Sequence, residues 1–196
     1  MLKKYKSLLS TKGVLYLMTR YAGSALRRCA FDQYYRSGRW DYLDKDHSLE
    51  VVKVVEKYAI KGRILDMGCG TGILASMLNS DSFEYYLGVD ASQEAISLAQ
   101  KRKDVKINFE VSDIQSYQCK AKFDVIIFEE SLYYVPFFHR RLLNRFAQSL
   151  YPGGLFIVTV ADPARFAGMI RMIRKNYHII EDRNFLNSKR LLLVFR

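Results

Sequence analysis

Short apolar runs alternate with segments of helical periodicity along most of the chain, beginning near residue 63. The runs predict buried strands at residues 63–67, 83–89, 106–111, 123–128 and 155–160. Between them, apolar residues three and four apart predict helices at residues 72–79, 92–102, 139–150 and 163–174. This alternation is typical of an α/β protein with a mostly parallel sheet and helices on both faces.

The C-terminal part departs from this alternation. Two extended runs, residues 177–182 and 190–195, are joined by a connection of only a few residues. Parallel neighbours need a crossover of about a dozen residues or more, so these strands must pair antiparallel. We therefore predict a Rossmann-like, seven-stranded, mostly parallel sheet with a C-terminal antiparallel hairpin strand. Pro-Gly-Gly at residues 152–154 additionally predicts a turn that ends the preceding helix.

The first 48 residues are expected to form a basic N-terminal helical extension and lid, and residues 49–196 to form the main domain. Residues 1–31 contain seven Lys or Arg and no acid. Their helical spacing of apolar residues predicts one basic amphipathic helix. The apolar positions are Val14, Leu15, Leu17, Met18, Tyr21, Ala22, Ala25 and Leu26. Such a helix can lie on an anionic surface, so peripheral membrane contact through residues 1–31 is one expectation.

The composition fits one cytoplasmic domain with an extension. A chain of 196 residues with 49% hydrophobic and 14% aromatic residues can bury a full core. The three cysteines, Cys29, Cys69 and Cys119, form no C-x-x-C pair and indicate neither disulfides nor a metal site. The longest apolar run near the N-terminus, residues 14–18, is too short for a signal peptide or for the ~20 residues of a membrane span.

The net charge of +11 is unevenly distributed. Residues 1–48 hold ten cations against four acids, and residues 137–196 hold eleven against three, whereas the middle of the chain is slightly acidic. Either this is an ordinary solvated basic surface, or the partner is anionic: a nucleic acid, a phosphorylated substrate or a membrane.

A glycine-rich turn follows the first predicted strand. Gly68, Gly70 and Gly72 end that strand and open a helix, where positive φ and close approach of a ligand to the backbone favour glycine. Asp90 ends the second strand, where a carboxylate can accept hydrogen bonds from both hydroxyls of a ribose. Asp113 ends the third strand at the same sheet edge, where it could accept from an adenine amino group while Ile114 packs on the ring. The competing interpretation is a set of helix-capping aspartates.

These motifs resemble those of the class I S-adenosylmethionine (SAM) methyltransferases. The run Leu65–Gly72 is similar to the first motif of that family, residues 88–90 to its second, and residues 150–154 to its late Pro-Gly-Gly turn. The resemblance implies a SAM cofactor, the product S-adenosylhomocysteine, and Asp66, Gly68 and Gly70 at the methionine end. The full expected set of cofactor-binding residues is Tyr35, Trp40, Asp66, Gly68, Cys69, Gly70, Asp90, Ala91, Asp113, Ile114 and Glu129.

The segment after the fourth strand bears on the acceptor. Residues 123–135 resemble the small-molecule branch of the family, and Leu132-Tyr133-Tyr134 is most similar to nodulation-factor N-methyltransferases and related glycan-tailoring enzymes. Residues 31–43 resemble the lid of those enzymes. Nucleobase N-methyltransferases carry Asn- or Asp-Pro-Pro-aromatic at the position where this chain has Glu-Glu-Ser-Leu, which argues against a nucleobase acceptor.

Glu130 is the candidate catalytic residue, because a carboxylate beside the sulfonium could take a proton from a hydroxyl or amine. The alternative is that it stabilises the following helix start. Tyr34, Tyr35 and Trp40 could cover the sulfonium by cation–π contact or simply pack the lid. Arg36 and Arg39 could bind the methionine carboxylate or be solvated. His47, near the lid, is the histidine most worth testing.

The leading hypothesis is a SAM-dependent methyltransferase acting on an amine or hydroxyl of a small acceptor, such as a sugar or a lipid-linked glycan. An RNA methyltransferase is the enzyme alternative, motivated by the charge, although no RNA-binding module precedes residue 63. A SAM-binding subunit without turnover is a third interpretation.

Overall fold

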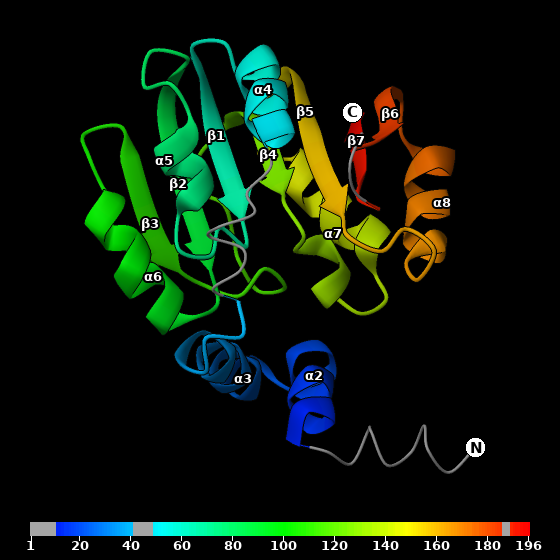
Figure 1. Ribbon diagram of the computed structural model, residues 1–196. Helices are drawn as coiled ribbons and strands as arrows, with labels where there is room; N and C mark the ends of the chain where they lie inside the picture. The colour runs from blue at the N-terminus through cyan, green and yellow to red at the C-terminus, as the bar shows by residue number, and fades with distance from the viewer. Residues whose placement is uncertain (1–10, 41–48, 186–188) are drawn as a thin grey trace.

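The computed structural model describes residues 11–40, 49–185 and 189–196. One seven-stranded sheet runs through it in the order β3-β2-β1-β4-β5-β7-β6 (Figure 1). The strands are β1 (Gly62–Met67), β2 (Phe83–Asp90), β3 (Ile107–Val111), β4 (Phe123–Phe128), β5 (Leu150–Val160), β6 (Ile179–Asn184) and β7 (Leu191–Phe195). The first five are parallel, and β7 lies antiparallel between β5 and β6. The predicted fold class is confirmed.

Helices cover both faces of the sheet, as alternating side chains of each strand require. Ile64 of β1 packs with α4 (Leu49–Tyr58), α5 (Ile73–Met77) and α6 (Gln93–Ala99), whereas its neighbour Leu65 packs with the opposite layer. That second layer holds α7 (His139–Ala147) and α8 (Ala167–Asn176). Two short 3-10 helices, η1 (Gln100–Arg102) and η2 (Leu132–Tyr134), complete the domain. Both faces of the central strands are therefore buried.

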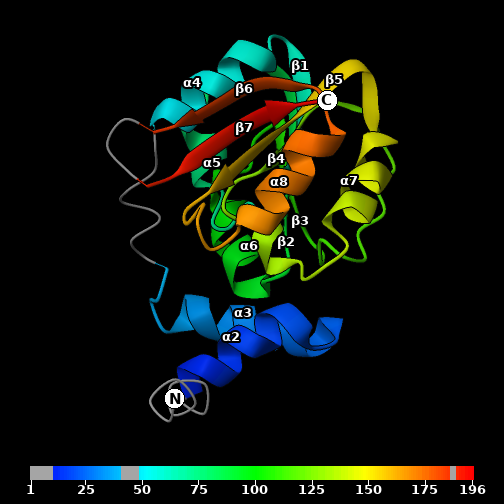
Figure 2. The same ribbon diagram turned by 90° about the vertical axis from the view of Figure 1, so that its right-hand side faces the viewer.

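Within residues 11–40, the part of the N-terminal extension that the structure describes, there are two helices, so the prediction of one continuous amphipathic helix was wrong. α2 (Thr11–Tyr21) and α3 (Ser24–Arg36) are separated at Ala22 and Gly23. Figures 1 and 2 show both helices lying across the carboxyl ends of the parallel strands. Most of the apolar positions of the predicted amphipathic helix do not form the face that docks on the domain. Val14, Leu17, Tyr21 and Leu26 are exposed, whereas Arg27, Ala30 and Tyr34 are buried.

The Pro-Gly-Gly segment was also predicted wrongly as a turn before the fifth strand. β5 already begins at Leu150, where it pairs with Phe123, and the next pairing joins Leu155 to Val125. Because only Asp124 of β4 lies opposite residues 151–154 of β5, these four residues form a bulge within the strand. α7 correspondingly ends at Ala147, three residues earlier than predicted.

Two glycines make room for an aromatic ring beneath the glycine turn. A Cβ atom at Gly72 would lie 2.7 Å from Cζ of Phe109, and one at Gly88 would lie 2.6 Å from its Cδ1. Phe109 belongs to β3 and is buried. The glycine turn and β2 therefore both pack against the ring of Phe109 in β3.

No helix in the described parts of the chain is long and apolar enough to cross a bilayer.

Candidate functional site: a cofactor cavity at the carboxyl edge

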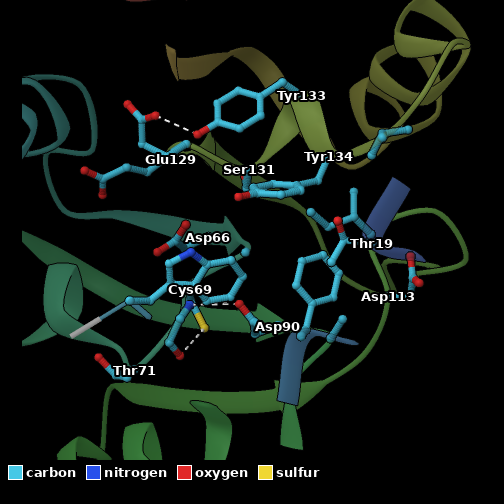
Figure 3. Close-up of a pocket in the computed structure, with 18 of the residues that line it drawn as sticks. Thr19, Asp66, Cys69, Thr71, Asp90, Asp113, Glu129, Ser131, Tyr133 and Tyr134 are labelled. Atoms are coloured by element: carbon cyan, nitrogen blue, oxygen red, sulfur yellow. Dashed lines mark hydrogen bonds between the residues drawn. The ribbon is translucent and has the colours of Figure 1, made fainter. Parts of the chain in front are cut away.

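A cavity with a volume of about 250 Å³ opens between the carboxyl ends of the strands and helices α2 and α3 (Figure 3). Every residue predicted to bind the cofactor lines it, and so does Glu130. Parallel strands bring these positions together, because the ends of β1, β2 and β4 meet at one edge of the sheet. The cavity also contains residues that sequence reasoning did not select, including Thr19, Arg27, Phe31, Gln115, Ser131 and Arg190.

The glycine turn forms one wall of the cavity. Gly68, Gly70 and Gly72 all have positive φ, at 90°, 56° and 78°, as the sequence pattern predicted. A Cβ at Gly68 would lie only 2.4 Å from Cβ of Ser131, whose hydroxyl donates to the Met67 carbonyl. The turn after β1 and the loop after β4 therefore approach each other too closely for any side chain at position 68.

Asp90 is buried at the end of β2 and holds the glycine turn in place. Its Oδ2 accepts the Gly70 N–H at 3.0 Å, and its Oδ1 accepts the Ser92 N–H at 2.8 Å. Burial raises the pKa of the Asp90 carboxyl to about 6, although these backbone donors act in the opposite direction. The position suits a carboxylate that accepts from ribose hydroxyls while bracing the loop beneath the ligand.

A pH dependence of cofactor affinity follows from this carboxyl. Only the ionised form accepts from both the loop and a ribose, so protonation of Asp90 should compete with binding. We expect SAM affinity to be constant above pH 6 and to fall by up to about tenfold per pH unit below it. Calorimetric titrations across this range would measure it. The Asp90→Asn variant should lose the dependence, and an unchanged profile in that variant would assign the titration to another group.

Asp66 and Cys69 lie in the same part of the cavity. Asp66 is buried, and its Oδ2 accepts a hydrogen bond from the Tyr86 hydroxyl. Burial raises the pKa of the Cys69 thiol well above its usual range, and the nearby Asp66 and Asp90 act in the same direction. Cys69 is therefore a neutral thiol that contributes shape and polarisability to the cavity, with no thiolate chemistry.

The part of the cavity near Asp113, where adenine is predicted to bind, contains a buried ion pair that was not predicted. Arg27 of α3 contacts Oδ2 of Asp113 through Nε at 2.8 Å and through Nη2 at 2.7 Å. Its Nη1 donates to the Ala22 carbonyl, which ties the α2–α3 junction to the same group. Asp113 also accepts the Gln115 N–H. The carboxylate expected to contact adenine is thus already engaged by the lid.

A spacing of four residues could have revealed the inner face of α3. Arg27, Phe31 and Tyr35 are separated by one helical turn each, and all three line the cavity. The apolar residues at positions 14–26 suggested a different face, because the charged Arg27 does not fit a search for apolar periodicity. Tertiary pairing with Asp113 is what makes an arginine suitable there.

Trp40 is the centre of the lid's aromatic cluster. Its ring centroid lies 4.8 Å from that of Tyr35, 5.1 Å from Tyr34 and 6.2 Å from Tyr134. Trp40 and Tyr35 line the cavity, whereas Tyr34 is buried beside it with the Arg39 guanidinium 5.0 Å from its ring. Among these lid aromatics and Phe31, three therefore face the cavity (Phe31, Tyr35 and Trp40) and Tyr34 packs beside it.

The predicted interaction of Arg36 and Arg39 with the methionine carboxylate finds no support in the geometry. Arg36 forms an exposed ion pair with Glu94 at 2.6 Å, Arg39 stacks on Tyr34, and neither lines the cavity. Arg36 lies one residue past Tyr35 on the helix and is exposed, which fits the alternative that it is solvated. His47 lies outside the described residues.

Glu130 lies at the other end of the cavity, in a strained backbone conformation with φ of 51°. Its Oε2 accepts the Tyr133 hydroxyl at 2.8 Å, and Nε of Arg190 lies 3.8 Å from its Oε1. Its backbone N–H donates to Thr159 at the end of β5. Burial raises the pKa of the Glu130 carboxyl, while Tyr133 and Arg190 act to lower it. The arrangement is a largely buried carboxyl whose pKa is raised by burial and which is oriented by Tyr133 and Arg190.

Comparison with known proteins places this site in a family. A family model for a methyltransferase domain matches residues 50–192. The ubiquinone biosynthesis O-methyltransferase of Rickettsia typhi is 26% identical over 151 residues, which cover 72% of this chain and 61% of that protein. The chain thus spans about three fifths of the length of the first curated relatives it matches.

Solved structures show the same fold. The methyltransferase in complex with the Trm112 methyltransferase activator of Haloferax volcanii superposes with a TM-score of 0.71 at 18% identity, covering 84% of this chain and 96% of that one. The N-methyltransferase NodS from Bradyrhizobium japonicum, in complex with S-adenosyl-L-homocysteine, gives 0.63 at 21% identity, covering 77% and 89%. The family model spans most of the chain and confirms the predicted methyltransferase assignment, with SAM as the cofactor. The chain therefore belongs to the methyltransferase domain family.

Proposed function

We propose that this chain transfers a methyl group from SAM to a hydroxyl or amine of a small acceptor, and that Glu130 is the general base. The observation that carries the proposal is that one cavity holds two chemically different ends. One end has the glycine turn and Asp90, and the other has the buried carboxyl of Glu130 among tyrosines. When bound, SAM supplies a methyl group already activated by its sulfonium.

The residues of the first end fit this cofactor. The turn leaves no room for side chains at position 68, and the Asp90 carboxylate lies beside it. In our proposal Asp90 accepts from the ribose hydroxyls, Asp66 and Gly70 lie against the methionine end, and Ile114 packs on the adenine. Tyr35 and Trp40 close the cavity from the lid and exclude water.

The residues of the second end orient and deprotonate the acceptor. The Tyr133 hydroxyl donates a hydrogen bond to one oxygen of Glu130. This hydrogen bond limits rotation of the carboxyl group and so fixes its orientation. The acceptor's hydroxyl or amine would give its proton to this carboxyl as it attacks the methyl carbon. Alignment of the two reactants in a closed cavity contributes the larger part of the acceleration.

The relatives favour a hydroxyl as the attacking group, without excluding an amine. The curated Rickettsia proteins are named as O-methyltransferases, and NodS and a glycopeptide enzyme as N-methyltransferases. The walls of the acceptor end are largely aromatic, with Phe31, Tyr133 and Tyr134 among its lining residues. These surfaces suit an acceptor with a flat or apolar body that presents one hydroxyl.

The Glu130→Gln variant tests the base. We expect kcat/KM to fall about 100-fold, because the amide cannot take the proton although it keeps the shape of the side chain. The wild-type profile should rise with pH through the raised pKa of Glu130, since the ionised form is the active one, and the variant should lose this acid limb. SAM affinity should be unchanged.

The matched control is Glu110→Gln. Glu110 also faces a tyrosine hydroxyl, that of Tyr117, but it lies outside the cavity. It should retain full activity. If Glu130→Gln keeps wild-type activity and the same pH profile, Glu130 only supports the loop after β4.

The function itself is tested by the appearance of S-adenosylhomocysteine in a screen of hydroxyl- and amine-bearing acceptors, followed by mass spectrometry of the methylated product. Turnover that requires RNA and collapses with added salt would instead support the nucleic-acid alternative suggested by the +11 charge. Tight SAM binding with no transfer to any acceptor would indicate a binding subunit.

A further inference from the structure

Five apolar side chains form an exposed patch beside the mouth of the cavity. They are Val14, Leu17, Tyr21, Phe137 and Phe138. The first three are three and four residues apart and share one face of α2. The Tyr21 and Phe137 ring centroids are 6.1 Å apart, so α2 and the segment before α7 contribute to one continuous surface. We call this surface the exposed apolar patch.

The two phenylalanines are held outside the core by the backbone. Phe137 and Phe138 are 67% and 74% exposed, and their φ angles are 57° and 33°. Bulky residues rarely adopt positive φ, and such conformations gather at functional sites. The following helix, α7, buries Leu142, Leu143 and Phe146 in the normal way. The local sequence therefore fills the core and still presents two rings to solvent.

Cations outnumber acids in the segments that form the patch, although the exposed Asp162 accepts the Arg165 N–H nearby. Residues 1–31, which include α2, contain no acid, and none occurs from residue 131 to residue 161. Arg140 and Arg141 follow the two phenylalanines after one intervening residue, His139, and are exposed. The Arg165 guanidinium donates to the Tyr16 hydroxyl on α2. Protruding apolar rings flanked by cations match the interface of an anionic bilayer, where rings enter the acyl boundary and arginines meet the headgroups. Binding to the phosphates of RNA would require the cations but not the protruding apolar rings.

The patch adjoins the acceptor end of the cavity. Tyr133, Tyr134 and Val135 line the cavity and lie immediately before the exposed phenylalanines in the chain. On α2, Thr19 lines the cavity from the opposite side of the same helix that presents Leu17 and Tyr21. A bilayer against the patch would therefore lie at the rim of the cavity.

We propose that the exposed apolar patch docks the protein on an anionic membrane surface and so presents the cavity to an amphiphilic acceptor in the bilayer. The docking stands on the patch alone, whereas the acceptor class rests on the function proposed above. An amphiphile would place its polar, hydroxyl-bearing head near Glu130 and leave its apolar tail in the membrane.

The test is sedimentation of the full chain with vesicles of phosphatidylcholine containing phosphatidylglycerol, compared with vesicles of phosphatidylcholine alone. The Phe137→Asn/Phe138→Asn variant removes both rings with a residue that tolerates positive φ. We expect it to lower the partition coefficient by about tenfold or more. The matched control is Ile60→Asn, since Ile60 is 74% exposed but precedes β1 at the opposite edge of the sheet. It should bind vesicles like the wild type.

A second pair of variants tests the charges. Arg140→Gln/Arg141→Gln should reduce binding to the anionic vesicles several-fold, whereas Lys101→Gln/Lys103→Gln, at the opposite edge, should not. Calorimetry should show unchanged SAM affinity in all four variants, which separates a failure of docking from a failure of the cofactor site. The proposal is overturned if the wild type stays in the supernatant. It is equally overturned if the phenylalanine and Ile60 variants bind alike, or if only the arginine pair matters and RNA competes fully.

Discussion

The Asp90→Ala variant should bind SAM about 100-fold more weakly than the wild type. Each hydrogen bond to a charged partner contributes about 1.5–3 kcal/mol, and our proposed site assigns two ribose hydroxyls to this carboxylate. The substitution also removes the acceptor of the Gly70 and Ser92 N–H groups, so the glycine turn loses its brace. Isothermal titration calorimetry with SAM and S-adenosylhomocysteine measures the effect directly.

Asp104→Ala is the control for this experiment. Asp104 accepts the Lys106 and Ile107 N–H groups in the same manner, but it precedes β3 at the amino edge of the sheet. Loss of its two backbone contacts should leave SAM affinity unchanged. If both variants bind SAM as tightly as the wild type, Asp90 does not contact the cofactor. The prediction that the strand ends together form the cofactor site would then also be wrong.

The Arg27→Ala variant should release the lid. The pair with Asp113 is buried, each side chain being 9% exposed, and removal of one partner of a buried ion pair costs about 3 kcal/mol or more. The remaining Asp113 carboxylate would then favour water in place of the docked helix. Amide hydrogen exchange in α2 and α3 should accelerate by about 100-fold, and SAM affinity should fall because the cavity loses one wall.

Arg36→Ala provides the comparison on the same helix. Arg36 also pairs with a carboxylate, Glu94, but its side chain is 60% exposed, and such pairs contribute about 1 kcal/mol or less. Its exchange rates should match the wild type. If the exchange rates of Arg27→Ala match those of Arg36→Ala, the aromatic contacts hold the lid in place and the buried ion pair contributes little.

The fold was predictable because its signals are local. Each central strand is a short apolar run, and the short connection between the last two strands requires antiparallel pairing. The errors occurred where tertiary contacts decide. Gly23 separates α2 from α3, and the residues of Pro-Gly-Gly, which usually end a helix, are accommodated by a bulge against Asp124 of β4. Neither outcome is visible in periodicity.

The site was predictable only where strand ends provide the residues. Asp66, Asp90 and Asp113 each follow a buried run, so parallel pairing brings them to one edge. Thr19 and Arg27 come from helices whose docking face could not be read from apolar spacing. Arg190 precedes β7, and it reaches Glu130 only because β7 pairs directly with β5. Long-range order of this kind has no sequence signature in a single chain.

Phe109 has a consequence for how relatives of this chain can vary. Its ring occupies the space that Cβ atoms of Gly72 and Gly88 would need, so a neighbouring side chain requires glycine at these two positions, although neither glycine lines the cavity. A Cβ at Gly88 would also lie 2.8 Å from Sγ of Cys69, so homologues that carry alanine at position 88 should have smaller residues in place of both Phe109 and Cys69, and these three positions should change together. Correlated substitutions at these positions in the family would then indicate a packing constraint. Conservation of the glycines alone would suggest only cofactor binding.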